Sequence, residues 1–326
     1  MRYRVYTKRL YYEIELNGKY TVLNGDSGKG KSVLYSLIYD KSAGDKSVHI
    51  DMLDKNGIWK PSDTQFFAVM PNDSNLVLNQ DNEGSVFVID ENASIFKQSN
   101  AATIFRQSRH QFLLITRKNI DYLPVSVENI FHLKNEGKKH FFEHEYKIEY
   151  KKNFGMQDII ITEDSNSGYK IFLEFFKNIP VRPAYSKSKI VKVISNLDKK
   201  YRNILVVYDA SAFGMQMKKF KEVLEKEKRN ISVLDWYSFE HHILAQPPFN
   251  NWIAPKSLDY TSESLEQYAA EQLSSIIKYS QRKDSIKPCL VKQSLCNTCD
   301  RIKFCKYVHS QFDLGAKIMF SKPVLK

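Results

Sequence analysis

The sequence predicts an α/β protein with two units, each built on a mostly parallel β-sheet, followed by a small basic module that holds the cysteines. Short apolar runs alternate with segments of helical character along most of the 326 residues, which is typical of parallel sheets covered by helices. A polar, charged stretch at 134–150 separates two such series. All four cysteines fall within 289–305. We therefore expect domains at 1–145, 150–250 and 255–326.

The composition is that of an ordinary globular protein, with 42% hydrophobic and 26% charged residues. No apolar run approaches the roughly 18 residues that cross a bilayer. Charges interrupt residues 1–20, where a signal peptide needs an unbroken apolar segment. These features predict a cytoplasmic protein with no membrane partner.

Strand signals recur along the first unit. Residues 1–24 alternate in the manner of strands, with Asn17-Gly18 as a turn signal between two of them. The other strand signals in this unit lie at 66–70, 85–89, 111–116 and 129–133. The segments between these runs have helical character, so the unit is expected to form an α/β sheet.

A glycine-rich segment between an apolar strand and a helix-like run indicates phosphate binding. Residues 25–32 read Gly-Asp-Ser-Gly-Lys-Gly-Lys-Ser, the P-loop pattern. Glycines let the backbone wrap around phosphates, and the amides at a helix N-terminus attract them. Lys31 is expected to reach the β- and γ-phosphates, and Ser32 to ligate Mg²⁺. The expected nucleotide-binding residues are Gly25, Gly28, Lys29, Gly30, Lys31 and Ser32.

Acidic and basic residues follow two later strands of the same unit. Asp90 and Glu91 end the run at 85–89, and Thr116-Arg117 ends the run at 111–116. Hydrolysis of a nucleotide needs an in-line water and neutralised phosphate charge. Asp90 suits the water shell of Mg²⁺ and Glu91 suits activation of the water. Arg117 is expected to lie beside the γ-phosphate as a sensor.

In this order and at these distances, residues 18–135 resemble the additional-strand class of P-loop ATPases, the broad group that contains AAA and RecA-like enzymes. The resemblance implies ATP as ligand and a site that is often completed across a subunit interface, by a protein partner or a second copy. Arg106 and Arg109 are available as an arginine finger or for an internal role. The Asp90-Glu91 pair favours an ATPase over a GTPase, and it argues against a nucleotide switch that barely hydrolyses.

The second unit repeats the α/β pattern with carboxylates at strand ends. Strands are expected at 158–162, 204–208 and 231–234, with helices at 168–178 and 215–228. Glu163 follows the first of these strands and Asp209 the second. Because the carboxyl ends of parallel strands meet at one sheet edge, the two side chains are expected to lie close together. Mg²⁺ is a natural ion for such a pair to bind, since its ligands are oxygen atoms and commonly include one or two carboxylates.

This arrangement resembles a Toprim domain, the metal-binding fold of topoisomerases, primases and overcoming-lysogenisation-defect nucleases. In that family a Glu follows the first strand and an Asp-x-Asp follows a later one, which Glu163 and Asp209 match. The second Asp of that motif is Ser211 here, which impairs a two-metal site unless Glu240 or another acid compensates. The alternative is a Rossmann-like domain whose strand-end carboxylates cap helices or face solvent.

The cysteine cluster predicts a metal centre in the C-terminal module. Four thiolates close together suit tetrahedral Zn²⁺ or an iron–sulfur cluster, and His309 can replace one ligand. Three of them resemble the iron–sulfur staple of RecB-like nucleases, so zinc and iron–sulfur both stay open. The expected ligands are Cys289, Cys296, Cys299 and Cys305. The apolar stripe at helical spacing within 265–277 is expected to be core.

The excess positive charge lies in the second half. The chain carries 49 Lys and Arg against 37 Asp and Glu, and residues 1–150 contribute almost none of the +12 net charge. Basic surfaces attract polyanions. The sequence therefore predicts an ATP-hydrolysing protein that acts on nucleic acid or is regulated by it, as a Toprim-type nuclease or its regulator in phage defence or mobile-element biology. The alternative is a non-nucleolytic ATPase that loads or gates a protein partner through an impaired Toprim-like docking domain.

Overall fold

The computed structural model describes residues 1–26, 28–71, 84–146, 148–152, 157–165, 169, 172–173, 176–236 and 321–325. The chain divides into two compact units, one containing Met1–Tyr146 and the other beginning at Lys147. The expected ligands Glu240, Cys289, Cys296, Cys299 and Cys305, together with His309 and the stripe at 265–277, lie outside the described residues.

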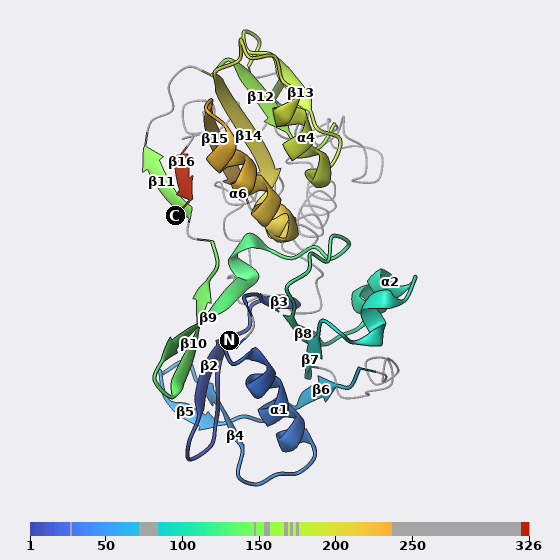
Figure 1. Cartoon of the computed structure of the whole chain (residues 1–326), viewed down its shortest axis with the longest axis vertical. Coiled ribbons are helices and arrows are strands. Elements are labelled where there is room, and N and C mark those ends of the chain that lie inside the picture. Colours follow the sequence, from blue (N-terminus) through green and yellow to red (C-terminus); the bar gives the residue numbers. More distant parts are fainter. Residues whose placement is uncertain are drawn as a thin grey trace, which may run out of the picture. The chain divides into compact units, whose positions relative to one another are not determined.

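The first unit contains a ten-stranded sheet with the order β5-β4-β1-β2-β10-β9-β3-β8-β7-β6 (Figure 1). In chain order the elements of this unit are β1 Arg2–Tyr6, β2 Tyr11–Glu15, β3 Tyr20–Leu23, α1 Lys31–Ser42, β4 His49–Leu53, β5 Trp59–Pro61, β6 Phe66–Val69, β7 Val86–Asp90, α2 Ala101–Gln107, β8 Gln111–Ile115, β9 Ile130–Glu136 and β10 Lys139–His144. Short 3₁₀ helices occupy Ser94–Lys97 and Val127–Asn129.

One half of this sheet is parallel, as the sequence predicts. Strands β9, β3, β8, β7 and β6 are each parallel to their neighbours in this series. All residues of β3 and β8 are buried, which explains why these strands are continuous apolar runs rather than alternating ones. Strand β8 lies between β3 and β7, although it follows both of them in the chain.

The other half of the sheet is mixed, because β10 pairs parallel with β2 while the remaining pairs are antiparallel. Strand β1 pairs antiparallel with both β2 and β4, β4 pairs antiparallel with β5, and β10 pairs antiparallel with β9. Short turns join β1 to β2, β4 to β5 and β9 to β10, and such turns allow only antiparallel pairing, whereas β1 and β4 are far apart in the chain. β10 lies within the polar stretch at 134–150, where no strand was expected.

Helices cover both faces of the parallel half. Leu34, Leu37 and Ile38 of α1 are buried in a cluster with residues from the strands. On the other face, Phe105 of α2 meets Phe112 of β8 edge to face, with ring centroids 4.9 Å apart. These two layers fix the parallel strands, so the loops at their carboxyl ends are held on a rigid frame.

The second unit contains a four-stranded sheet with the order β13-β12-β14-β15, in which all pairs are parallel. Its elements are β12 Ile159–Thr162, β13 Val181–Pro183, α4 Ile190–Ser195, β14 Asn203–Asp209, α5 Ala210–Phe213, α6 Met217–Lys226 and β15 Asn230–Trp236, with 3₁₀ helices at Lys187–Lys189 and Gly214–Gln216. A separate antiparallel pair joins β11 Ile148–Lys152 to β16 Ser321–Leu325.

The strands expected at 158–162, 204–208 and 231–234 are present in the second unit. The helix expected at 215–228 begins as a 3₁₀ turn and continues as α6. Of the helix expected at 168–178, only Tyr169, Phe172 and Leu173 are described as helical. Both sheets therefore make this an α/β chain. None of its described helices is both long and apolar enough to cross a membrane.

Candidate functional site

A glycine-rich loop connects the end of β3 to the start of α1. Gly25, Gly28 and Gly30 have φ angles of 115°, 80° and 100°, a region that glycine reaches without the steric penalty of a Cβ. At Gly30 a Cβ would also lie 3.1 Å from the Tyr12 hydroxyl oxygen. The loop therefore requires glycine for its conformation and, at Gly30, for its close packing.

Lys31 is the first residue of α1, and its side chain turns back into this loop. Its ammonium donates hydrogen bonds to the backbone carbonyls of Gly25 and Asp26, the second at 2.6 Å. Burial lowers the pKa of Lys31, and the nearby charge of Arg117 lowers it further, while Glu91, Asp26 and Asp90 oppose the shift. Ser32 is exposed in the first turn of α1. The loop thus presents a cation and a hydroxyl at one helix N-terminus.

The carboxyl end of β7 supplies two carboxylates with different partners. Asp90 Oδ1 accepts hydrogen bonds from the backbone and side-chain nitrogens of Asn92, at 3.1 and 2.8 Å. Glu91 binds Arg117: its Oε2 accepts the backbone N–H at 2.9 Å, and its Oε1 accepts Nε and Nη2 at 3.0 and 2.5 Å. These bonds from Arg117 hold the pKa of Glu91 below its usual range. The Glu91 side chain is 13% exposed, whereas that of Arg117 is 53% exposed.

The strand register brings these residues to one level. Ile115 at the end of β8 pairs with Leu23 at the end of β3 on one side and with Asp90 on the other. The residues that follow β3, β8 and β7 are the glycine-rich loop, Thr116-Arg117 and Glu91, respectively. The structure therefore places Lys31, Asp90, Glu91 and Arg117 at one sheet edge. The hydroxyl of buried Thr116 bonds to the backbone of Lys118 at 3.0 and 2.9 Å, and its backbone N–H donates to the Leu23 carbonyl at 3.2 Å.

Three residues that contact the loop were not singled out from the sequence. The Tyr12 hydroxyl donates to the Gly30 carbonyl at 3.1 Å, and burial raises the pKa of Tyr12 to about 12. His140 stacks on Tyr12 with ring centroids 4.4 Å apart, and burial lowers the pKa of His140. Asn135 bonds both His140 Nδ1 at 2.8 Å and the Lys29 carbonyl at 3.3 Å. Neither the spacing nor the residue types of these three positions predict contact with the loop, because β2, β9 and β10 approach it only in the folded sheet.

The two residues expected as metal ligands in the second unit, Glu163 and Asp209, also lie at one sheet edge. Glu163 Oε2 accepts a hydrogen bond from the backbone N–H of Asp209 at 3.1 Å. Asp164 faces another partner, the backbone N–H of Tyr169 at 3.0 Å. Ser211 is 1% exposed, and its Oγ has no hydrogen-bond partner among the described residues. No group of three or more His, Cys, Asp or Glu side chains is arranged for a metal ion in the parts of the chain that the structure describes.

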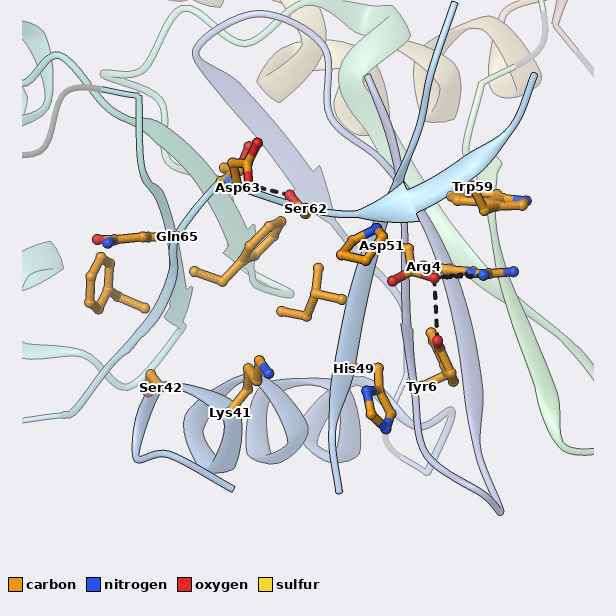
Figure 2. Close-up of a pocket in the computed structure, with 15 residues that line it drawn as sticks. Arg4, Tyr6, Lys41, Ser42, His49, Asp51, Trp59, Ser62, Asp63 and Gln65 are labelled. Atoms are coloured by element: carbon orange, nitrogen blue, oxygen red, sulfur yellow. Dashed lines mark hydrogen bonds and ion pairs between the residues drawn. The ribbon is translucent and has the colours of Figure 1, made fainter. Parts of the chain in front are cut away.

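A cavity of about 700 Å³ opens on the antiparallel half of the first unit (Figure 2). Two of the charged residues that line it, Arg4 and Asp51, form an ion pair with each other. Arg4 binds Asp51 Oδ2 through Nε and Nη2 at 2.8 and 2.5 Å, and the guanidinium lies between the rings of Tyr6 and Trp59, 5.1 Å from each centroid. Tyr6 in turn stacks on His49 at 5.2 Å. This stacked column joins β1, β4 and β5, and we assign it a structural role.

Comparison with known proteins adds no assignment to this geometry. No model of a known protein family matches the chain, and no curated protein matches its sequence. A functional proposal therefore depends on the residues and contacts described above.

Proposed function

We propose that the first unit binds and hydrolyses ATP. The observation that carries this proposal is the pairing register of three adjacent parallel strands, in which Ile115 lies opposite both Leu23 and Asp90. It brings a glycine-rich helix N-terminus, an ammonium and two carboxylates to one edge. Backbone amides and a cation bind phosphate, and carboxylates of the kind supplied by Asp90 and Glu91 serve the metal and the water.

Each of these residues has a distinct proposed role. Loop amides and Lys31 bind the phosphates, and Glu91 orients the attacking water and accepts its proton. Ser32 and Asp90 would hold Mg²⁺, which neutralises phosphate charge when bound. Ser32 and Asp90 fit this ion, because both supply oxygen atoms, which Mg²⁺ prefers as ligands, and because Ser32 is exposed. We assign Arg117 to the γ-phosphate, since its long, largely exposed side chain can leave Glu91 at little cost in burial.

The strand order supports a particular class of ATPase. Strand β8 lies between β3, which leads into the glycine-rich loop, and β7, which ends in Asp90. An added strand at this position is what the additional-strand class of P-loop ATPases is named for. Arg117 on the following turn then lies next to Glu91, as a sensor residue of that class would.

Phosphate release from ATP by the purified chain tests this proposal. The wild type should hydrolyse ATP only with Mg²⁺ or a similar cation present. Lys31→Ala should lower kcat/KM by roughly 100-fold or more, because charge contacts to the reacting phosphates are commonly worth several kcal/mol. Lys41→Ala is the matched control, since Lys41 lies at the opposite end of the same helix. Equal rates for all three proteins would remove the proposed role of Lys31.

For the second unit we propose a Toprim-like domain that acts on nucleic acid, with Glu163 and Asp209 as its metal ligands. The contact between them supports a shared edge, and the basic second half of the sequence supports a polyanionic partner. Mg²⁺ or Mn²⁺ should then support cleavage of DNA or RNA, and Glu163→Ala should abolish cleavage without changing ATP hydrolysis. Absence of cleavage with every strand type would favour the other candidate.

That other candidate is a non-nucleolytic ATPase that loads or gates a protein partner. Ser211 favours it, because a neutral, buried hydroxyl stands where the Toprim pattern has a second acid. In that case the second unit is a docking domain, and neither wild type nor Glu163→Ala cleaves nucleic acid. Cross-linking from this sheet edge in cells would then recover protein rather than nucleic acid.

For the cysteine cluster we propose a structural metal centre, with zinc first and an iron–sulfur cluster as the alternative. Elemental analysis should find about one centre per chain. An absorption spectrum separates the two metals, because zinc thiolates are colourless whereas iron–sulfur clusters absorb visible light. Cys296→Ser with Cys299→Ser should lose the metal and destabilise the C-terminal module, because metal binding and folding are coupled. Wild-type protein that folds normally without metal would refute this proposal.

A further inference from the structure

One exposed tyrosine in the second unit has an unfavourable backbone conformation. Tyr185 has φ 69° and is the one non-glycine residue with positive φ within the described ranges. Bulky side chains avoid this region, which glycine and asparagine adopt more readily. The side chain is nevertheless 69% exposed, so burial of the ring does not offset the strain. Folding alone gives no reason for a tyrosine at this position.

The turn that carries Tyr185 is anchored on both sides. The preceding residue, Ala184, is buried and donates its N–H to the Thr162 carbonyl at 2.8 Å. Two residues after Tyr185, the Lys187 ammonium donates to the Ala212 carbonyl at 2.8 Å. The turn is therefore tied to the end of β12 and to α5, and these contacts hold the strained residue in place.

These anchors put Tyr185 at the sheet edge that carries the carboxylates. Thr162, which receives the Ala184 N–H, immediately precedes Glu163, and Ala212 lies three residues after Asp209. Because β12, β13 and β14 are parallel, the turn after β13 is at the same edge as Glu163 and Asp209. An exposed aromatic ring and the two acidic residues thus share one edge of one sheet.

Three exposed cations lie within seven positions of Tyr185 in the sequence. Arg182, Lys189 and Lys192 are exposed, and none of them forms an ion pair within the described part of the chain. Lysine and arginine side chains of this kind contact phosphates and fix the position of a nucleic acid strand. An exposed aromatic ring close in sequence to such cations provides a face on which an unpaired base can stack.

We propose that Tyr185 is a stacking residue for single-stranded nucleic acid at the Glu163–Asp209 edge, with Arg182, Lys189 and Lys192 as its phosphate contacts. This inference rests on the proposed nucleic-acid function of the second unit. A single strand is required because bases inside a duplex are already stacked on their neighbours and cannot cover an extra ring. The strained turn keeps the ring pointed to solvent, where a base can reach it.

The test compares binding of wild type and Tyr185→Asn to fluorescent oligonucleotides of DNA and RNA, single-stranded and duplex. Wild type should bind single strands more tightly than duplex. Tyr185→Asn should weaken single-strand binding about tenfold, whereas Tyr185→Phe should keep it. Tyr201→Asn is the matched control, because Tyr201 precedes β14 at the opposite sheet edge. Lys189→Ala should weaken all strands alike and reduce the salt dependence of binding.

Thermal unfolding separates a binding role from a structural one. Asparagine tolerates positive φ, so Tyr185→Asn should keep or raise the unfolding midpoint, by up to about 2–4 °C. A lower midpoint, or unchanged binding by Tyr185→Asn, overturns the inference and leaves the proposed nucleic-acid function intact. Duplex binding as tight as single-strand binding also overturns it. If wild type binds no nucleic acid of any kind, the inference and the proposed nucleic-acid function fail together.

Discussion

The two parallel sheets of this protein end in acidic residues with different partners. In the first unit, Glu91 is bound by the guanidinium and backbone of Arg117. In the second unit, Glu163 is bound by the backbone N–H of Asp209. A guanidinium can move away when another anion arrives, whereas a backbone amide in the sheet stays in place. The same topology therefore gives one edge a movable counter-charge and the other a fixed, uncharged hydrogen-bond donor.

This difference indicates that parallel strands bring side chains together at one edge of the sheet. The chemistry of that edge depends on which residues lie next to them. In the first unit the strand register also brings a helix N-terminus and Lys31 to the carboxylates. In the second unit the position expected for a further acid is the buried Ser211. We therefore expect robust ATP chemistry in the first unit and weak or partner-dependent metal chemistry in the second.

Among the variants that test the comparison between the two edges, removal of the movable counter-charge should have the largest effect. Arg117→Met should lower kcat for ATP hydrolysis by roughly 100-fold, because a cation aimed at developing phosphate charge is lost. It should also shift the acid limb of the pH profile of kcat/KM to higher pH, because kcat/KM reports the free enzyme, in which Arg117 binds Glu91. Arg117 holds the pKa of Glu91 below its usual range, so its removal lets that pKa rise, and Glu91 then becomes protonated at a higher pH.

Arg117→Lys is the informative control for this experiment. It keeps the charge but loses the forked contact, so it should fall between wild type and Arg117→Met in both rate and acid limb. If the acid limb lay at the same pH in all three proteins, protonation of Glu91 would not control the rate. That result would contradict the comparison between the two edges.

The second prediction tests the other side of the comparison. Ser211→Asp restores the Toprim pattern in sequence, but the structure buries this position almost completely. A charged carboxylate there should cost about 2–4 kcal/mol of unfolding free energy unless it becomes protonated or binds a cation. Thermal or urea unfolding measures this cost, with Ser195→Asp on the exposed end of α4 as control. Unchanged stability together with new Mg²⁺-dependent cleavage would show that the position faces the metal site.

The third prediction asks whether the charged column beside the cavity is structural. Asp51→Asn weakens the ion pair with Arg4, in which the Arg4 side chain is 28% exposed and that of Asp51 9%. The substitution should lower the free energy of unfolding by about 1–3 kcal/mol. ATP hydrolysis should stay within about twofold of wild type. Lys60→Ala, which removes an exposed pair with Asp54, should leave the unfolding midpoint unchanged. A large loss of ATPase activity in folded Asp51→Asn would instead connect this cavity to the site.

The smallest expected effect concerns the support of the glycine-rich loop. Tyr12→Phe removes the hydroxyl that donates to the Gly30 carbonyl, a bond worth about 1 kcal/mol. We expect KM for ATP to rise about fivefold while kcat stays near the wild-type value. Steady-state kinetics at several ATP concentrations measures this, and Tyr39→Phe on the exposed side of α1 is the control. A fall in kcat alone would place Tyr12 in the chemistry rather than in loop support.

Much of the parallel framework could be predicted from the sequence, because buried strands leave continuous apolar runs. The runs at 66–70, 85–89 and 111–116 correspond to β6, β7 and β8. The glycine-rich loop and the residues after β7 and β8 were also identified, since polar residues at strand ends stand out against apolar strands.

The remaining features depend on pairing between distant segments. Strands β4, β5 and β10 have charged residues among their apolar ones, so no continuous apolar run distinguishes them from loops. The antiparallel pairing of β1 with β4 joins residues about fifty positions apart, which no local pattern shows. The burial of Ser211 and the strained turn at Tyr185 likewise arise from tertiary contacts rather than from residue type.

The central claim, that the edge formed by β3, β8 and β7 is an ATPase site, is tested most directly with Glu91→Gln. ATP affinity and phosphate release should be measured on the same preparation with Mg²⁺. This variant keeps the shape of the side chain but cannot accept a proton. We predict an ATP Kd within about twofold of wild type and a kcat lower by roughly 100- to 1,000-fold. Hydrolysis at the wild-type rate, or loss of both binding and hydrolysis in a folded protein, would contradict it.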